Sequence, residues 1–221
     1  DTLVIDKATN QSVKVVALEA ADSVVEYKLA DATGSTDSVT FELKQAADAN
    51  SIADGGQIKT TDIETVTVKA STGAESISLA NLSMTATDAT MSLNITGDQA
   101  LTVSATNADI NVIDASGMDE GGSFIQTGRA RLDAVTYTGS DGDDTFMMNH
   151  KDDAIAAGAG TGDKLVITKQ LILGGIEVDL TKTDDVLLTM NGNASSSVQS
   201  GFESVDLSNI TGTFGAEITA I

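Results

Sequence analysis

The sequence predicts an all-β protein that forms a right-handed parallel β-solenoid, in which short strands stack in register and additional β-strands flank the stack. Residues 62–114 alternate apolar and polar side chains almost continuously, as in 63–68 (IETVTV), and this alternation is typical of strands with one buried face. Aromatic residues make up only 3% of the chain and proline is absent. Few aromatics and no proline suit a solenoid, whose interior is a narrow stack of aliphatic and β-branched side chains between uninterrupted strands.

Apolar residues recur along this region at intervals of about nine to ten residues, as Met84, Leu93, Val103 and Val112 show. Turn-forming Asn, Asp, Gly, Ser and Thr fill the gaps between them. The interval is the length of a strand plus a tight turn, which favours a coil of a β-solenoid. A meander of antiparallel hairpins is the alternative, because spacings of about 8–12 residues also occur in sandwiches.

Helical signals are scarce. Residues 44–49 (KQAADA) have the composition of a short helix or turn, and residues 195–200 (SSSVQS) that of a polar loop.

A Gly- and Asp-rich run occupies residues 139–165, and each of Asp144, Asp153 and Asp163 is followed two residues later by an apolar residue. Glycine turn, aspartate and apolar residue make the nonapeptide G-G-x-G-x-D-x-U-x of a calcium-binding parallel β-roll. Glycines permit a tight turn with inward carbonyl groups, and the carboxylate adds the hard oxygen that Ca²⁺ prefers. The predicted metal-ligating positions are Gly139, Asp141, Gly142, Asp144, Asp153, Gly158, Gly160 and Asp163.

The three nonapeptides depart from this pattern in different ways. The first has Ser140 where a second glycine is usual, the turn at 149–152 has no glycine, and the third carries one extra residue. Alternate nonapeptides of a two-strand coil stack on one side, so Asp144 and Asp163 are expected to flank one calcium ion. Asp153 is expected on the opposite side, beside the poor turn. The alternative is an acidic loop between strands that binds no metal.

The charge of the chain excludes several functions. With 33 acidic and 12 basic residues the formal charge is −21, which argues against a nucleic-acid partner, because affinity for phosphates comes from Lys and Arg. Such a chain stays soluble until divalent cations neutralise it. The absence of cysteine argues against disulfide scaffolds, zinc-thiolate sites and thiol catalysis. No apolar run approaches the roughly 20 residues of a membrane span.

Catalytic signatures are missing as well. His150, the single histidine, reads as a turn residue beside Lys151 and Asp152, and no Gly-x-Ser-x-Gly elbow is present. Adjacent carboxylates such as Asp143-Asp144 point to opposite faces of a strand, so they do not form an acid–base pair. With no tryptophan and two tyrosines, the chain lacks the aromatic platforms of a polysaccharide lyase or glycosidase. The protein is therefore not expected to be an enzyme.

A larger repeat spans the chain. Residues 1–6 (DTLVID) resemble 163–168 (DKLVIT), and further on two more landmarks follow in the same order, 37–43 with 185–190 and 63–68 with 202–207. This order predicts part of an array of modules, beginning and ending inside it. We expect four parts: a β-rich segment at 1–61 after a preceding roll, a β-solenoid at 62–138, roll turns at 139–168, and a β-rich segment at 169–221 that leads to a further module.

Four segments between about residues 60 and 170 resemble the RTX-containing bacterial surface-layer proteins and, more loosely, large type I-secreted adhesins. They are 64–68 (ETVTV), 97–103 (GDQALTV), 112–118 (VIDASGM) and the Gly/Asp nonapeptides. The resemblance implies a secreted, calcium-dependent structural protein of a Gram-negative surface. It also implies an RTX-like roll whose calcium ligands are Asp144 and Asp163, with the carbonyl groups of Gly142 and Gly160.

The leading expectation is thus a calcium-dependent structural module of a secreted bacterial surface-layer protein. It would lie on the outside of the cell and self-associate with neighbouring copies, with any attachment to surface polysaccharide made through other parts of the parent protein. The alternatives are a segment of a type I-secreted RTX adhesin and a calcium-free β-solenoid spacer.

Overall fold

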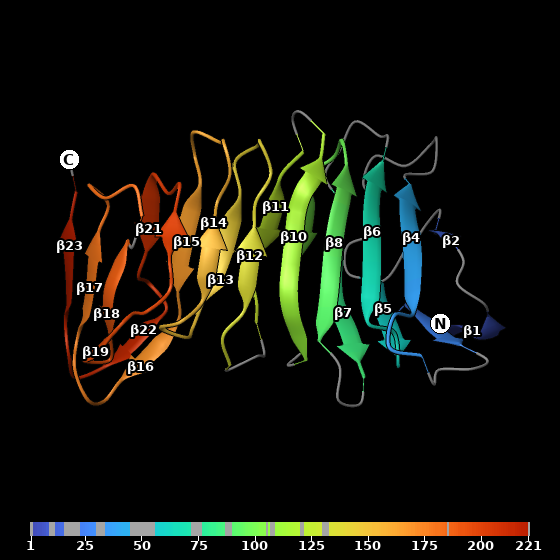
Figure 1. Cartoon of the computed structure of the whole chain (residues 1–221), viewed down its shortest axis with the longest axis horizontal. Helices are drawn as coiled ribbons and strands as arrows, with labels where there is room; N and C mark the ends of the chain where they lie inside the picture. The colour runs from blue at the N-terminus through green and yellow to red at the C-terminus, as the bar shows by residue number, and fades with distance from the viewer. Residues whose placement is uncertain are drawn as a thin grey trace.

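The computed structural model of the chain describes residues 2–8, 12–15, 23–29, 34–44, 56–71, 77–86, 90–104, 106, 109–119, 122–129, 133–184 and 186–220. Within these ranges all regular secondary structure is β-strand, and no helix is long and apolar enough to cross a membrane. The strands follow one another along a single long axis, from β1 at one end to β23 at the other (Figure 1).

Two long parallel sheets make up the body of the molecule, and we call them the odd and the even sheet after the numbers of their strands. The odd sheet contains β1 (Thr2–Ala8), β3 (Val24–Leu29), β5 (Gly56–Thr61), β7 (Ile77–Thr85), β9 (Leu101–Val103), β11 (Phe124–Gln126), β13 (Thr145–Met148), β15 (Lys164–Ile167) and β21 (Ser204–Asp206). The even sheet contains β2 (Ser12–Val15), β4 (Ser38–Lys44), β6 (Thr65–Ser71), β8 (Met91–Gly97), β10 (Ile110–Met118), β12 (Thr136–Thr138), β14 (Ala154–Ala156) and β20 (Gln199–Ser200).

Each of the first fifteen strands lies in the opposite sheet from the strand before it, so one coil of the chain consists of two strands. All pairings within the two sheets are parallel, as between β6 and β8 or β13 and β15. In Figure 1, β4, β6, β8 and β10 run upward while β7 behind them runs downward. This arrangement confirms the predicted parallel solenoid and excludes antiparallel hairpins for the alternating region.

The recurring apolar residues mark half a coil rather than a whole one. Met84 lies in β7, Leu93 in β8 and Val103 in β9, so each step of the recurrence carries the chain to the other sheet. The period of a full coil is therefore about twice the interval that the sequence displays.

The core lies between the two sheets and is built by the alternation itself. In β6 the buried apolar side chains are Val66, Val68 and Ala70, and Val66 and Val68 pair in register with Leu93 and Ile95 of β8. Stacking like on like in successive coils gives a continuous apolar column. Burying each such side chain contributes about 1.5–3 kcal/mol relative to leaving it exposed.

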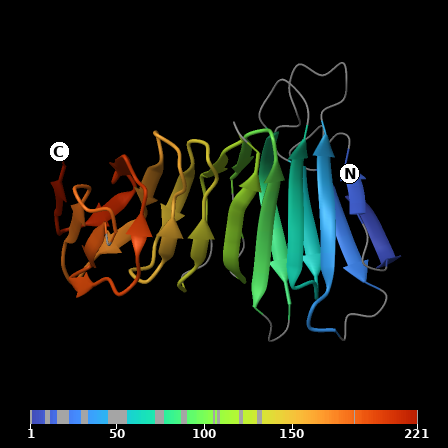
Figure 2. The same cartoon turned by 45° about the horizontal axis from the view of Figure 1, so that its top comes forward.

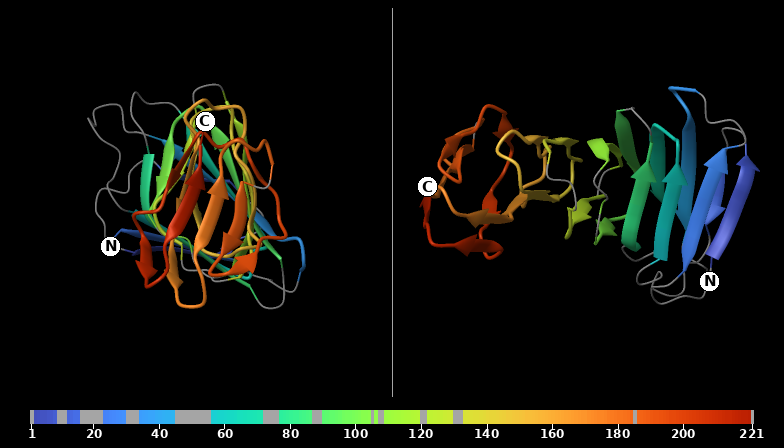
Figure 3. Two further views of the ribbon diagram at one scale, coloured as in Figure 1. Left: turned by 90° about the vertical axis from the view of Figure 1, so that its left-hand side faces the viewer. Right: turned by 90° about the horizontal axis from the view of Figure 1, so that it is seen from below.

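The coils become shorter and their core more aromatic toward the middle of the molecule. Hydrogen-bonded partners in adjacent coils are 27 residues apart at β4 and β6 but 18–20 apart between β11 and β15. The strands shorten from seven to nine residues in β6, β7, β8 and β10 to three or four there, which Figure 3 shows from below. In these coils the Phe146 ring lies 5.3 Å from that of Tyr137 and 5.9 Å from that of Phe124, measured between centroids.

At the C-terminal end the coil acquires a third strand. The strands there are β16 (Lys169–Leu171), β17 (Ile176–Asp179), β18 (Leu187–Met190), β19 (Asn193–Ala194), β22 (Ile210–Gly212) and β23 (Ala216–Thr219). Strands β15, β16 and β17 pair in parallel with β21, β22 and β23, and β18 and β19 add antiparallel pairings beside β17. Figure 2 shows this C-terminal part, in orange and red, beside the narrow coils.

The sheets pass through each of the expected segment boundaries. Strands β1 to β5 already belong to the same two sheets as β6 to β15, and β20 and β21 extend those sheets into the last segment. The predicted helix at 44–49 lies, apart from Lys44 at the end of β4, outside the described residues. The predicted polar loop at 195–200 ends in β20, whose Gln199 is fully buried.

The larger repeat corresponds to equivalent structure only at its first landmark. Strands β1 and β15, which start the two copies, both lie in the odd sheet. At the second landmark, β4 of the first copy lies in the even sheet, whereas its counterpart β18 pairs with β17 and β19 in a separate sheet. At the third landmark, β6 lies in the even sheet and its counterpart β21 in the odd sheet. Similar strand patterns thus occupy different faces, because the excursion through β16–β19 changes the strand count of the coil.

Candidate metal site at the narrow coils

Strand pairing places the three predicted aspartates at two opposite corners of the narrow coils. We use corner for the turn that leads into a strand, either of the odd sheet or of the even sheet. Asp144 directly precedes β13 and Asp163 directly precedes β15, and these strands are parallel neighbours with Phe146 beside Leu165. Asp153 directly precedes β14 in the even sheet. The expected stacking of Asp144 and Asp163, with Asp153 on the other side, is present.

An acidic residue before a strand has a recurring role in this fold. Its carboxylate accepts a hydrogen bond from a backbone N–H one coil earlier, and in the odd sheet this links Phe124, Asp144, Asp163 and Glu203 into one ladder. The Phe124 amide donates to Asp144, the Asp144 amide donates to Asp163 at 2.8 Å, and the Asp163 amide donates to Glu203 at 2.9 Å. We call these four residues the carboxylate ladder.

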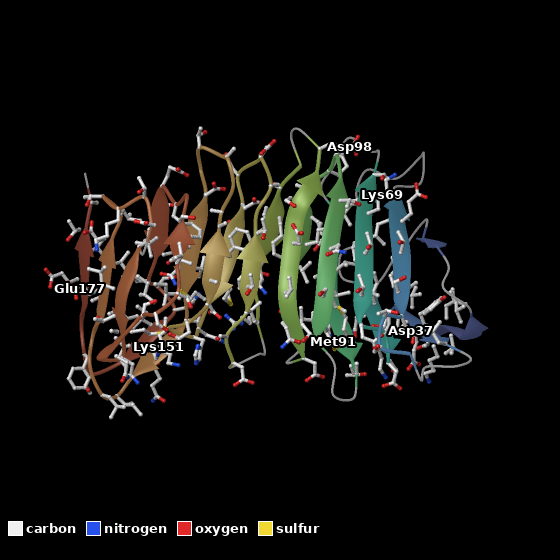
Figure 4. All side chains as sticks on the ribbon, in the orientation of Figure 1. Asp37, Lys69, Met91, Asp98, Lys151 and Glu177 are labelled. Atoms are coloured by element: carbon white, nitrogen blue, oxygen red, sulfur yellow. The ribbon has the colours of Figure 1, made fainter. Side chains whose placement is uncertain are left out.

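The even sheet uses the same device along its own starting edge. The Asp37 amide donates to Glu64 at 2.7 Å and the Val135 amide to Asp153 at 2.8 Å. The neutral Asn111, inside β10, accepts the Met91 amide at 2.9 Å in a comparable way. Figure 4 shows Asp37 and Met91 at the lower edge of this sheet, where its strands begin. The acidic residue before many alternating runs therefore accepts a hydrogen bond from a backbone amide at the start of the preceding coil.

Asp144 is buried, and its carboxylate is well supplied with hydrogen bonds. Besides the Phe124 amide, it accepts the Ser140 amide at 2.6 Å and the Ser140 hydroxyl at 2.9 and 3.0 Å. Burial raises the pKa of Asp144, while the hydrogen bonds from Phe124 and Ser140 lower it in part. Ser140, the departure from the nonapeptide pattern, thus supplies neutral donors to the first carboxylate.

Asp163 is equally buried but less well satisfied. Its Oδ1 accepts the Asp144 amide, whereas its Oδ2 has no hydrogen-bond partner among the described residues. Burial is the main cause that raises the pKa of Asp163 from 3.8 to about 6, with a contribution from the neighbouring charges of Asp144, Glu203 and Asp143 and against the lowering effect of the hydrogen bond from the Asp144 amide. The ladder concentrates negative charge, and among the described residues no Lys or Arg forms an ion pair with Asp144 or Asp163.

Glycine at position 160 lets the backbone of this turn approach the carboxylate of Asp163 closely. A Cβ atom on Gly160 would lie 2.5 Å from the carbonyl oxygen of Gly142 and 2.8 and 3.0 Å from the two carboxylate oxygens of Asp163. The missing side chain therefore lets a backbone carbonyl oxygen and a buried carboxylate come close together. Such hard oxygens are the donors that Ca²⁺ takes.

The other predicted positions have distinct roles. Asp141 is exposed on the turn, and Asp143 is exposed too, where its carboxylate accepts the amides of Thr161 and Gly162 at 3.0 and 2.9 Å. Gly139 and Gly158 lie where adjacent coils approach most closely, with the Gly139 amide 2.7 Å from the Ala156 carbonyl oxygen. In the described part of the chain, no three His, Cys, Asp or Glu side chains gather as a metal site, so backbone oxygens would have to complete one.

Asp153 forms an ion pair with a side chain of the protein itself, that of Arg129. Arg129 forms a two-pronged ion pair with it, Nη1 donating to Oδ2 and Nη2 to Oδ1, the latter at 2.9 Å. Both side chains are buried, with 1% and 0% of their surfaces exposed. The sequence analysis missed Arg129, although the rarity of arginine in so acidic a chain was a signal, and it also left Glu203 out of the candidate ligands.

His150 has the expected place in a turn. Its Nδ1 accepts the amide of Asp152 at 3.2 Å, and its own amide donates to Asp153 at 3.2 Å. These contacts give it a local role in shaping the turn at 149–153.

Comparison with known proteins identifies no relative: no protein-family model, no curated protein and no solved structure matches this chain.

Proposed function

We propose that the protein is a calcium-dependent structural module of a secreted bacterial surface-layer protein, which self-associates with neighbouring copies on the cell surface. The observation that supports the metal is the buried Asp163 Oδ2, which lacks a hydrogen-bond partner among the described residues and lies close to the Gly142 carbonyl oxygen across Gly160. The long solenoid supports a structural role, because its repeated coils offer extended faces and open strand ends.

Calcium would supply the positive charge that the carboxylate ladder lacks. Asp163 and Asp144 would hold it through their carboxylates, with the carbonyl oxygens of Gly142 and Gly160. Ca²⁺ accepts six to eight such oxygen ligands. Because the ion would bind the folded coils and hardly the unfolded chain, its binding free energy adds to folding, by about 2.7 kcal/mol at a free concentration 100 times Kd.

This coupling would act as a folding switch during secretion. In a low-calcium cytosol the carboxylates repel one another, so the chain stays open enough for type I export. Outside the cell, calcium neutralises the ladder and the coils close. The formal charge of −21 makes this switch strong, since every cation bound also reduces the general repulsion.

A calcium-free spacer is the second candidate, and one observation favours it. Each ladder carboxylate already accepts a backbone amide from the adjacent coil, so the acidic residues have a structural use without any metal. A third reading, a segment of an RTX adhesin, shares the calcium chemistry and differs in what the surface binds.

Calcium titration of matched variants tests the proposal. We expect wild-type protein to bind Ca²⁺ in isothermal titration, Asp163→Asn to lose most of the affinity, and Asp153→Asn to retain it, because Arg129 already occupies that carboxylate. Replacing Asp144 and Asp163 together should weaken binding further. Asn keeps an oxygen that accepts the Asp144 amide, so the coil is preserved.

Glu217→Gln is the control, because it removes one negative charge from an exposed residue of β23. Absence of calcium binding by the wild type would favour the spacer, and equal losses in the Asp153 and Asp163 variants would contradict the assigned corner. For the assembled parent protein, electron micrographs in calcium should show a two-dimensional lattice, whereas isolated filaments would favour the adhesin.

A further inference from the structure

The corner at Asp153 differs from the corner at Asp163 in how its carboxylate is satisfied. Oδ1 of Asp153 accepts Arg129 Nη2 and the Val135 amide, and Oδ2 accepts Arg129 Nη1 together with the amides of Asn149 and His150. Both oxygens of this buried carboxylate are thus engaged, and its charge is balanced.

Arg129 also ties together parts of the chain that are far apart in sequence. Beyond Asp153, Nη2 donates to the carbonyl oxygen of Asp133 at 2.6 Å and Nη1 to that of Met147 at 3.4 Å. Its guanidinium carbon lies 5.8 Å from the centre of the Tyr137 ring. One planar cation therefore connects the segment before β12, the strand β13 at Met147 and the turn before β14, as a bound ion connects its ligands.

We propose that Arg129 is a built-in cation that takes the place of a metal ion at this corner of the coil. The proposal explains why the turn at 149–152 lacks glycine. A guanidinium donates along fixed directions to a carboxylate and to two carbonyl oxygens, so the turn has no need to crowd several inward carbonyl groups around a small ion.

The inference goes beyond the proposed calcium site and does not require it. One corner of the narrow coils is held by a covalently attached charge, which is present in every compartment and at every calcium concentration. The part of the narrow coils that stays closed around Arg129 without calcium gives the opposite corner a template on which to close. Metal dependence is then confined to the corner of Asp144 and Asp163.

Hydrogen exchange in wild-type protein gives the first test. We expect the amides of Val135 and His150, which donate to Asp153, to be equally protected in calcium and in chelator. Loss of their protection on chelation would overturn the proposal, because this corner would then depend on the metal.

Replacement of Arg129 gives the second test. Arg129→Ala leaves a buried carboxylate without its partner, and the His150 and Val135 amides are expected to exchange about 100-fold faster. Free guanidinium ion, at concentrations far below those that denature, should restore both the protection and the melting temperature of this variant. The same addition should leave wild type and the Arg129→Ala, Asp153→Asn double variant unchanged.

Arg129→Lys keeps the test decisive if the alanine variant does not fold. A lysine retains the charge but not the fork, so His150 and Val135 should lose protection while the Phe124 amide, at the other corner, keeps it. Wild-type exchange in Arg129→Lys, or no rescue of Arg129→Ala by guanidinium, would refute the proposal. Because both variants are compared in chelator as well as in calcium, failure of calcium binding at Asp163 leaves these outcomes intact.

Discussion

Aspartate performs three different tasks within a short stretch of this chain, and the task depends on what surrounds each carboxylate. Asp143 is exposed and caps the amides of the next turn, Asp153 is buried against Arg129, and Asp163 is buried with one oxygen unpartnered among the described residues. The same residue type is thus a turn cap, half of an ion pair and a candidate ligand. Burial without a counter-charge is what distinguishes Asp163.

This environment predicts an unusual dependence of stability on pH in metal-free protein. The folded pKa of Asp163, about 6, lies above its ordinary value of 3.8, so the folded state binds this proton more tightly than the unfolded chain. The cost of the buried charge is therefore present above pH 6 and disappears as the pH falls toward 3.8. We expect the free energy of unfolding to increase on acidification from neutral pH through this window, as measured by urea unfolding.

Calcium should suppress that dependence, because protons and the metal compete for the same carboxylates. A bound cation lowers the pKa of Asp163, so acidification through the same window should no longer increase the free energy of unfolding while calcium is in excess. Asp163→Asn should remove the pH dependence of the metal-free protein. Identical pH profiles for wild type and this variant would show that Asp163 does not titrate in this window.

At the scale of the strand, the acidic residue before an alternating run provides the hydrogen-bond acceptor for a backbone amide of the preceding coil. Glu64 illustrates this away from the candidate metal site: 8% exposed, it accepts the Asp37 amide at 2.7 Å where β4 and β6 begin side by side. A parallel coil leaves such a leading amide without a strand partner, and the side chain from the next coil provides one.

Removing this acceptor should destabilise the fold with or without calcium. Glu64→Ala leaves the Asp37 amide without its acceptor, and we expect a loss of about 1–3 kcal/mol of unfolding free energy. Glu64→Gln keeps an oxygen in place and should cost less. Thermal unfolding of the two variants in chelator and in calcium measures the difference, and a calcium-dependent effect would mean that Glu64 contributes to metal binding.

At the scale of the whole molecule, the two sheets are continuous while their interior changes along the axis. The wide coils around β6, β8 and β10 bury long aliphatic columns, whereas the narrow coils around β13 combine an aromatic cluster with the carboxylate ladder. Apolar stacking dominates the wide coils, and the narrow coils contain the three fully buried aspartates, Asp144, Asp153 and Asp163. The response to calcium is therefore expected to vary along the solenoid.

Chelation should lower the melting temperature and accelerate hydrogen exchange most strongly at residues 139–165, and less at residues 63–113. The reason is that only residues 139–165 contain the proposed calcium ligands, whose mutual repulsion calcium would relieve. Exchange measured by mass spectrometry with and without chelator gives the profile. Uniform acceleration along the chain would instead indicate one cooperative unit.

Assembly is expected to depend on the same ion. Exposed apolar side chains lie near both ends, Leu3 and Val4 in β1 and Phe214 and Ile218 around β23, where strand edges are also open. A charge of −21 opposes their association until cations neutralise it. We predict that the protein is a monomer in chelator and forms end-to-end or lateral contacts in calcium. Light scattering across a calcium titration measures the change in size. An oligomer of the same size in both conditions would favour the calcium-free spacer.

Much of the fold followed from local patterns. Period-2 alternation determined which residues of β6, β8 and β9 face the core, because a strand turns successive side chains to opposite faces. The nonapeptide spacing likewise placed Asp144 and Asp163 on one side and Asp153 on the other, since the two-strand coil makes alternate repeats neighbours. These features are properties of a few consecutive residues and need no knowledge of distant ones.

The tertiary structure alone decided which partners those residues meet. Arg129 reaches Asp153 from 24 residues away and Glu203 reaches Asp163 across 40, distances set by coil lengths and by the excursion through β16–β19. No local period encodes such lengths, so the sequence specified the strands and their faces but not the neutralisation of each buried charge. Whether a carboxylate at a corner is satisfied, paired or left with a vacant oxygen depends on what the next coil brings beside it.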